Sequence, residues 1–229
     1  MTAPDEPRRK PGPAPRLSRE QMLDVALAQV RERGQGGLTM RGLAEELGLG
    51  VMTLYNYFRT KEELLDGVCG HALRALRADP DPGAPWERQL ETAIRDLHLA
   101  LADNPGVLDV FVTRSVYGPT LDQVRETLLG ILRGAGFADR EAVHALGALV
   151  SYAVGFTLTE RARSPKTAPV NPATRFRALS PEEFPHLTST AEQYREYLSD
   201  AAFEYGLRHL IGSIQRDRER SIQRDLDGR

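Results

Sequence analysis

The chain has 229 residues, 41% of them apolar, with a formal net charge of −2 and a single cysteine, Cys69. One cysteine excludes an intrachain disulfide framework, no apolar run approaches the roughly 20 residues of a membrane-spanning helix, and the charged, Pro-rich start is no secretory signal, so we expect a cytoplasmic protein that meets no membrane. Residues 1–61 carry +3 and the remainder −5, which fits an N-terminal part that contacts a polyanion and equally fits a solvated basic tail.

The N-terminal segment 1–17 holds five prolines and the basic run Arg8-Arg9-Lys10, a composition typical of a disordered arm. A first helix is expected to begin at Ser18, because Ser18 and Gln21 have the spacing of a capping box. Three glycines, Gly34, Gly36 and Gly37, are expected to end it.

Two short helices are expected next, with the turn Gly48-Leu49-Gly50 between them. Thr39 can cap the first, and the second covers about 51–58. Two short helices joined by a glycine-containing turn of three or four residues are typical of a helix-turn-helix. The same pattern is consistent with an ordinary helical hairpin whose tyrosines lie half-buried in a core.

Docking of the second short helix in a DNA major groove would give its polar and aromatic side chains a role. Its first turn would face base edges, through Val51, Met52 and Thr53. The hydroxyls of Tyr55 and Tyr57 could donate to phosphates, and Lys61 could neutralise another. Phe58 is expected to pack inward. The short helix is therefore interpreted as a recognition helix.

The rest of the chain is also predicted to be helical. A fourth helix is expected from Lys61 to about residue 76, and a turn cluster at 78–85 follows it. Further helices are expected at about 86–102, 105–113, 121–135, 139–162 and 191–220. No stretch alternates with a period of two residues, so the fold class is all-α. The Pro-rich segment 164–190 is expected to be a long flexible connection, and the repeated SIQRD near the C-terminus a frayed helix end.

The stretch from Gly36 to Val68, GGLTMRGLAEELGLGVMTLYNYFRTKEELLDGV, resembles the DNA-binding domain of the TetR family of bacterial transcriptional regulators. The rest resembles the regulatory domain of the tetracycline-repressor branch, in Trp86, NPGV and EAVHALGALVSYAVGFTLTE. The resemblance implies an all-α homodimer with two recognition helices in successive major grooves and a ligand cavity in each body. The expected domains are a basic disordered arm, a helix-turn-helix domain, an effector-binding and dimerisation domain and a charged tail, at 1–17, 18–66, 67–220 and 221–229.

The resemblance also implies contacts with a palindromic double-stranded DNA operator. Phosphate contacts are expected from Thr39, Tyr55, Tyr57 and Lys61. Base contacts are expected from Arg41, Val51, Met52, Thr53 and Asn56. The basic side chains of the arm suit an adjacent minor groove and equally suit a solvated tail; they are Arg8, Arg9, Lys10 and Arg16.

In this branch the last two long helices of each subunit form a four-helix bundle across the dimer. The corresponding apolar stripes here are Val143, Leu146, Leu149, Val150 and Val154, and then Phe203, Leu207, Leu210 and Ile211. Nearby small residues would allow a partner helix to approach, namely Gly147, Ala148, Gly155 and Gly206. The same stripes are also consistent with a core inside one subunit.

The effector cavity is expected among the helices of residues 70–160. Its candidate lining is Leu97, Leu101, Phe111, Arg114, Tyr117, Leu128, Tyr152 and Phe156, although each of these residues would also suit a plain core. The apolar set predicts an apolar, aromatic or polycyclic ligand. The stretch LADNPGVLDVFVTR has no histidine, so we expect neither tetracycline nor a metal ion, and no cofactor.

No HExxH, G-x-S-x-G or P-loop pattern occurs, so the protein is not expected to be an enzyme. It is expected to be a ligand-responsive transcriptional regulator, a repressor that a small molecule releases from its operator. The alternative is an all-α partner- or ligand-binding module that does not bind DNA. Salt-dependent retention on immobilised DNA would distinguish the two.

Overall fold

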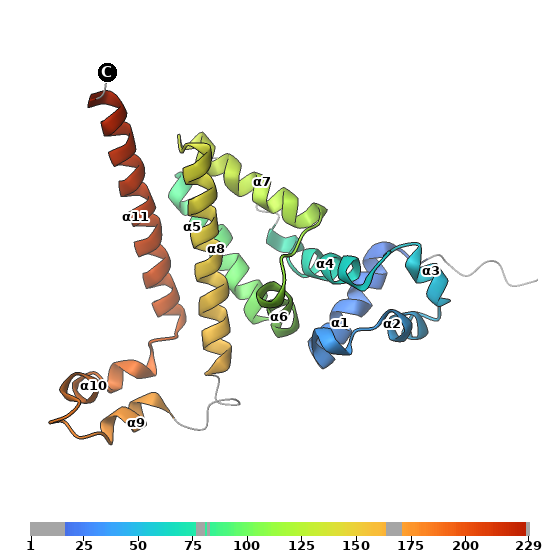
Figure 1. Cartoon of the computed structure of the whole chain (residues 1–229), viewed down its shortest axis with the longest axis horizontal. Helices are drawn as coiled ribbons and strands as arrows, with labels where there is room; N and C mark the ends of the chain where they lie inside the picture. Colours follow the sequence, from blue (N-terminus) through green and yellow to red (C-terminus); the bar gives the residue numbers. More distant parts are fainter. Residues whose placement is uncertain (1–16, 77–80, 82, 164–170, 228–229) are drawn as a thin grey trace, which may run out of the picture.

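The computed structural model describes residues 17–76, 81, 83–163 and 171–227, and all its regular elements are helices, as predicted. Figure 1 shows a small helical head on one side, a larger helical body on the other, and α4 between them. The predicted arm at 1–17 lies outside the described residues, apart from Leu17.

The head consists of α1 (Arg19–Gly37), α2 (Met40–Glu46) and α3 (Val51–Tyr55). The predicted capping box opens α1: the Gln21 backbone N–H donates to Ser18 Oγ at 3.1 Å and the Ser18 N–H donates to Gln21 Oε1 at 2.8 Å. Gly34, with φ 69°, breaks the helical path near the end of α1. The predicted starts of these helices are therefore confirmed to within a residue.

The next element, α4 (Lys61–Ala72), begins in the head and continues into a short 3₁₀ turn at Arg74–Leu76. Thr60 caps α4, since the Glu63 N–H donates to Thr60 Oγ1 at 3.0 Å. The helix packs against α1 of the head and against helices of the body. It is thus the element that connects the two regions.

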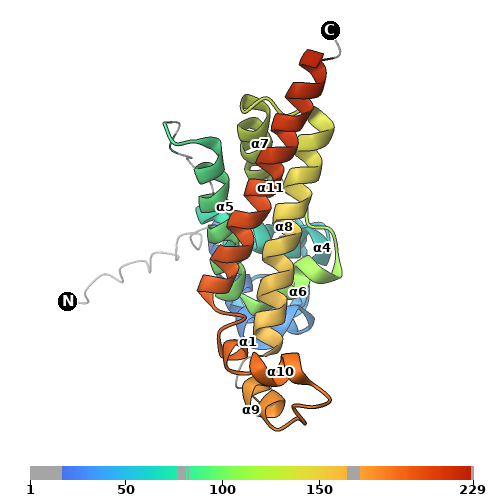
Figure 2. The same cartoon turned by 90° about the vertical axis from the view of Figure 1, so that its left-hand side faces the viewer.

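The body contains α5 (Trp86–Ala102), α6 (Pro105–Thr113), α7 (Pro119–Gly134), α8 (Asp139–Ala162) and α11 (Asp200–Asp227). The bounds predicted for α5, α6 and α8 are confirmed. In Figure 2 the two longest helices, α8 and α11, lie side by side on one face of the molecule. Both SIQRD copies lie within α11, which extends beyond its predicted end.

The prediction of a flexible connection at 164–190 is wrong for 171–190, whereas 164–170 lie outside the described residues, and the predicted helix start at 191 is also wrong. The described part forms α9 (Pro172–Arg177), α10 (Pro185–Ser189) and a 3₁₀ turn at Glu192–Arg195. Two of the prolines stand at the first position of α9 and α10, where the missing N–H costs nothing, so they begin helices instead of excluding them. The last helix begins only at Asp200, because Ser199 caps it: the Ala202 N–H donates to Ser199 Oγ at 3.3 Å.

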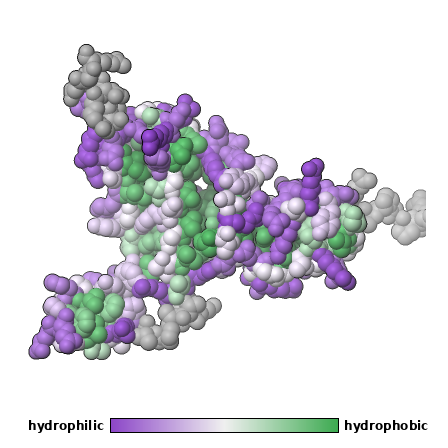
Figure 3. Space-filling view, viewed as in Figure 1, coloured by the Kyte–Doolittle hydropathy of each residue, from purple (hydrophilic) through white to green (hydrophobic). Residues whose placement is uncertain are grey.

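One body helix is more apolar than the sequence pattern indicated. Averaged over a window of 18 residues, α8 is long and apolar enough to cross a membrane by length and composition alone, although polar residues such as His144 and Ser151 interrupt its apolar runs. Only 28% of that window is buried in this single chain. The hydropathy view in Figure 3 shows hydrophobic residues gathered over the body, whereas the outside of the head is mostly hydrophilic. An apolar part of α8 is therefore left uncovered.

Candidate DNA-binding surface and effector cavity

The pair α2–α3 is held together by a small apolar core and a tight turn. Leu43 and Ala44 of α2 and Leu54 of α3 are fully buried, and so is Phe58 just beyond α3, as predicted. Gly48 ends α2 with φ 65°, a conformation that a residue with a Cβ rarely adopts, and the Leu49 N–H then donates to the Ala44 carbonyl at 2.9 Å. This arrangement has the form of a helix-turn-helix.

The side chains of α3 that the core does not use point outward. Met52 is 76% exposed and Tyr55 40%, and Thr53 and Asn56 are exposed as well. Val51 and Tyr57 are half-buried and pack against the core. Met52 is the most exposed of the large apolar side chains that the structure describes, and on a helix of five residues it contributes little to folding.

The remaining predicted DNA contacts flank these two helices. Thr39 caps α2, with its Oγ1 accepting from the Gly42 N–H at 3.0 Å. Arg41 is almost fully exposed and pairs with Glu45 at 3.0 Å between Nε and Oε1. An exposed pair of this kind stabilises a protein by at most about 1 kcal/mol, so Arg41 can leave Glu45 for another partner. Lys61 is the first residue of α4. All nine candidates thus lie on or beside α2 and α3.

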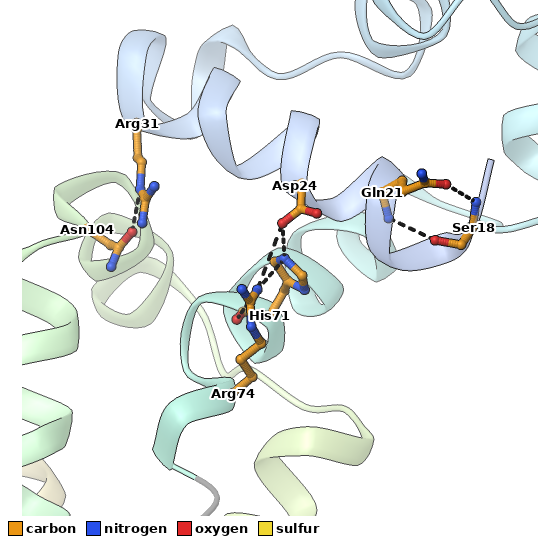
Figure 4. A network of polar contacts seen from close by, with 7 residues as sticks. All are labelled: Ser18, Gln21, Asp24, Arg31, His71, Arg74 and Asn104. Carbon is orange, nitrogen blue, oxygen red and sulfur yellow. Dashed lines mark hydrogen bonds and ion pairs between the residues drawn. The ribbon is translucent and has the colours of Figure 1, made fainter.

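Polar contacts fasten the head to α4 and to the body (Figure 4). Asp24 Oδ1 of α1 lies 2.6 Å from Nε2 of His71 on α4, and Nη1 of Arg74 lies 2.5 Å from the same nitrogen. Arg31 of α1 donates from Nε to Asn104 Oδ1 at 2.7 Å, just before α6. The helix α1 is therefore tied to both α4 and α6.

Arg114, a predicted effector residue, instead joins α4 to the end of α6. Its Nη2 lies 3.0 Å from Asp66 Oδ1, and its Nη1 donates to the Glu62 carbonyl at 3.2 Å. Cys69 lies one turn further along α4 and is fully buried. Burial, and secondly the charge of Asp66, raise the pKa of its thiol to about 12, so Cys69 stays protonated and unreactive.

A cavity of about 350 Å³ lies where the end of α4 meets the body helices. Three of the predicted effector residues line it: Leu97 of α5, Phe111 of α6 and Leu128 of α7. The rest of its lining is Leu73, Leu76, Ala93, Ile94, Leu121, Val124, Arg125, Leu129, Val143, Leu146, Gly147 and Val150. Leu73 and Leu76, at the end of α4 and in the turn that follows it, thus form part of the wall.

The other predicted effector residues lie elsewhere. Leu101 is fully buried beside a second, more polar cavity of about 900 Å³ near α9. Tyr117 is 62% exposed, and the guanidinium of Arg125 lies 5.4 Å from its ring centre. Arg125 was missed, although a helix-spaced stripe on α7 pointed to it: residues 121, 124, 125 and 128 share one face, and Arg125 is its only charged member.

Tyr152 and Phe156 belong to an aromatic cluster between α5, α8 and α11. The Phe203 ring stacks on His98 at 4.1 Å and on Tyr152 at 5.3 Å between ring centres, and Phe156 meets its edge. The Tyr152 hydroxyl donates to the Phe203 carbonyl at 2.9 Å. A Cβ on Gly206 would lie 2.1 Å from that hydroxyl oxygen, so Gly206 is needed inside the subunit.

His98 carries the polar contacts of this cluster. It is 4% exposed, and its Nδ1 lies 2.8 Å from Thr157 Oγ1. Burial lowers the pKa of His98, against the opposing charges of Glu160, Asp200 and Glu204. Glu204 in turn binds Arg95, with Arg95 Nη2 and Glu204 Oε2 2.7 Å apart, and this hydrogen bond is the main cause that lowers the pKa of Glu204. The cluster fixes α11 to α5 and α8.

The stripes predicted to face a partner subunit are largely used within the chain. Leu149, Phe203, Leu207 and Ile211 are buried in the core, Leu146 and Val150 line the cavity, and Val143 borders the cavity but is 57% exposed. The open face of α8 carries small residues instead, namely Ala148, Ser151 and Gly155, with Tyr205 of α11 61% exposed. A Cβ on Gly155 would meet nothing within 4 Å. The open face of α8 is therefore distinguished by its small residues and not by the apolar stripe predicted from the sequence.

Among the residues that the structure describes, no group of three or more His, Cys, Asp or Glu side chains is arranged to hold a metal ion.

Comparison with known proteins gives matches over both regions. The family model described as "Bacterial regulatory proteins, tetR family" matches residues 22–68, and the model described as "Tetracyclin repressor-like, C-terminal domain" matches residues 79–217. The tetracycline repressor protein class A from transposon 1721 of Escherichia coli is 30% identical over 220 residues, covering 93% of this chain and 96% of that protein.

Two Streptomyces proteins are also similar. The HTH-type transcriptional repressor DrrR1 of Streptomyces coeruleorubidus is 33% identical over 145 residues, 63% of this chain and 54% of that protein. The crystal structure of the TetR family protein ActR from Streptomyces coelicolor in complex with actinorhodin has a TM-score of 0.76 at 27% identity, over 90% of this chain and 99% of that chain.

Proposed function

We propose a division of labour for this chain, which belongs to the TetR family of bacterial transcriptional regulators. As a member it is a ligand-responsive, DNA-binding repressor and not an enzyme, so the DNA-independent binding module that the sequence left open is set aside. Residues 18–66 bind DNA and residues 67–220 bind the effector and dimerise, with an arm at 1–17 and a charged tail at 221–229. The protein acts in the cytoplasm.

In this proposal α3 enters the major groove. Its exposed first turn and Asn56 reach base edges together with Arg41, while Tyr55, Tyr57, Thr39 and Lys61 hold phosphates. The burial of Leu54 and Phe58 supports this orientation, because it leaves only the opposite side of the short helix for DNA.

We further propose that two chains pair through the open face of α8 and α11. The uncovered small residues Ala148, Ser151 and Gly155 allow two helices to approach closely, and the adjacent Tyr205 supplies apolar area. A two-fold dimer requires a palindromic operator whose half-sites are about 10 base pairs apart, or roughly 34–36 Å.

The observation that carries the regulatory part of the proposal is the position of α4. Lys61 at its start follows the recognition helix, and Arg114 binds Asp66 in its middle. Asp24 of the head binds His71 near its end, and Leu73, just after it, lies in the cavity wall. A ligand in the cavity would therefore touch the end of an element that is bound to the head. Binding that favours a different spacing of the two heads must weaken DNA binding, by reciprocity of coupling.

The proposed DNA binding by a dimer is tested by selecting binding sites from random oligonucleotides. The molecular mass of the protein–DNA complexes is then measured by sedimentation. Two chains on one palindrome are expected. A single chain on an asymmetric site would contradict the dimer.

The regulatory part is tested by cross-linking the two α4 helices of a DNA-bound dimer. The cross-linked protein is expected to keep its DNA affinity and to lose its response to ligand. Release of DNA from the cross-linked dimer on addition of ligand would show that helix spacing is not the switch.

A further inference from the structure

The side chains around the 350 Å³ cavity have an unusual polar composition. Among the described residues that line it, Arg125 alone carries a polar side chain, and the others are Leu, Ile, Val, Ala, Phe and Gly. An arginine has five N–H donors and no acceptor. The side chains of this wall can therefore donate hydrogen bonds to a ligand but cannot accept one.

Two hydrogen bonds hold Arg125 at the cavity, and its guanidinium also lies 5.4 Å from the centre of the Tyr117 ring. Its Nη2 donates to the Val116 carbonyl at 2.6 Å, in the segment between α6 and α7, and its Nη1 donates to Asp122 Oδ1 at 3.1 Å. These bonds engage two of its N–H groups and leave donors for a further partner. The side chain is 42% exposed, so it lies at the edge of the cavity and not in its depth.

These constraints decide between classes of ligand. An acidic group at the edge would form charge-assisted hydrogen bonds with Arg125, which are about twice as strong as neutral ones. A group that only donates, such as an ammonium, would find no acceptor on the side chains of the lining and would face Arg125, whose charge Asp122 offsets in part. A buried donor left without a partner costs about 1–3 kcal/mol, and more when it is charged.

We propose that the effector is an apolar molecule with one acidic group, a carboxylate or a phenolate, and that Arg125 binds this group. The assignment rests on the proposed role of the cavity as the effector site. The aliphatic walls take the apolar body, with Leu97, Phe111 and Leu128 on three different helices around it. Asp122 orients the guanidinium, so it is a positioning residue for Arg125.

The proposal is tested by calorimetry on the full chain without DNA, using three probes that share one bicyclic aromatic body. These are naphthalene-2-carboxylate, the neutral ketone 2-acetylnaphthalene and the cation 2-naphthylmethylammonium. Naphthalene-2-carboxylate is expected to bind tightest and the ammonium weakest. Arg125→Met is expected to weaken carboxylate binding about tenfold or more while leaving ketone binding within about twofold.

Arg133→Met is the matched control, because Arg133 also lies on α7 but pairs with Asp139 outside the cavity. It is expected to change the affinity of none of the probes. Equal binding of carboxylate and ammonium by the natural chain, no detectable carboxylate binding, or a loss in Arg125→Met that is the same for carboxylate and ketone would each overturn the proposal.

DNA affinity of the natural chain and of both variants is measured separately on the selected operator. It is expected to be the same for all three. Loss of DNA binding by the natural chain would contradict the proposed function and leave the charge selectivity of the cavity standing. Loss of the charge selectivity alone would leave the DNA-binding function standing.

Discussion

The head and the body use apolar residues differently. In the head, Leu43, Leu54 and Phe58 share one small core, and what remains on α3 is exposed. In the body, a single helix, α8, has three apolar or small-residue faces: Leu149 is in the core, Leu146 is on the cavity and Gly155 is on the open side. In the head, the apolar pattern therefore identifies the core, and the residues outside it are the candidates for function. In the body, the same kind of pattern does not show which residues face the core, the ligand or a partner.

The largest effect is expected from two aromatic residues of the head, only three positions apart. Phe58→Ala removes a fully buried ring and should lower the free energy of unfolding by about 3–5 kcal/mol. Tyr55→Ala removes an exposed ring and should change it by less than about 0.5 kcal/mol while weakening DNA binding. Urea unfolding and DNA titration check both. Equal losses of stability in Phe58→Ala and Tyr55→Ala would contradict the assignment of Phe58 to the core and Tyr55 to the surface.

The open face of α8 is tested by Gly155→Arg. Because nothing lies within 4 Å of a Cβ at this position, the single chain should stay folded. A charge buried between two subunits should raise the dimer dissociation constant about a hundredfold or more, and DNA affinity should fall with it. Sedimentation checks the dimer.

Gly130→Arg is the control for this variant, since Gly130 is an exposed helical glycine on α7 with equally open surroundings. It should leave the dimer intact. A stable dimer of Gly155→Arg would show that the subunits pair through another surface.

Much of the head follows from local chemistry. Ser18, Thr39, Gly48 and the apolar spacing define the helices and the turn, and each signal acts within a few residues of its effect. The cavity in the body is formed by side chains from five elements of the chain, and their packing cannot be read from local patterns. The predicted lining therefore contained Leu97, Phe111 and Leu128 together with residues that lie elsewhere. Arg114 and Arg125 illustrate why. Arg114 lies directly after α6 and Arg125 on α7, and only the folded structure shows that Arg125 reaches the cavity whereas Arg114 does not.

The proposed base contacts and the proposed phosphate contacts of the head should respond differently to substitution. Arg41→Ala should cost about 1–3 kcal/mol on the preferred operator and relax the preference at one base position. Lys61→Ala should weaken binding to all sequences about equally and reduce the dependence on salt. Titrations against the operator and its single-base variants check both. A uniform loss in Arg41→Ala would make Arg41 a phosphate contact.

The smallest effect is expected in the body, from His98. Because its pKa is lowered in the folded chain, the unfolded chain binds more protons, and stability should fall as the pH drops below the ordinary value of 6.5. His98→Gln should lose less stability than the natural chain between about pH 7.5 and 5.5, as unfolding by urea would show. His186→Gln, at an exposed position on α10, is the control. An unchanged pH dependence in His98→Gln would contradict the burial argument.

The central claim is that a ligand in the cavity weakens DNA binding through α4. Its most direct test is the DNA affinity of the natural chain and of Leu128→Phe, each with and without a small molecule that binds the natural chain. Leu128→Phe places a larger side chain of α7 in the cavity. Leu132→Phe is the control for the larger side chain, because Leu132 lies one turn further along α7, is fully buried and does not line the cavity.

In this measurement the ligand should reduce the DNA affinity of the natural chain by about 5–150-fold, the usual range of allosteric coupling. Leu128→Phe should bind DNA as well as the natural chain does and should not respond to the ligand. A response that persists in full when the cavity is filled would contradict the account.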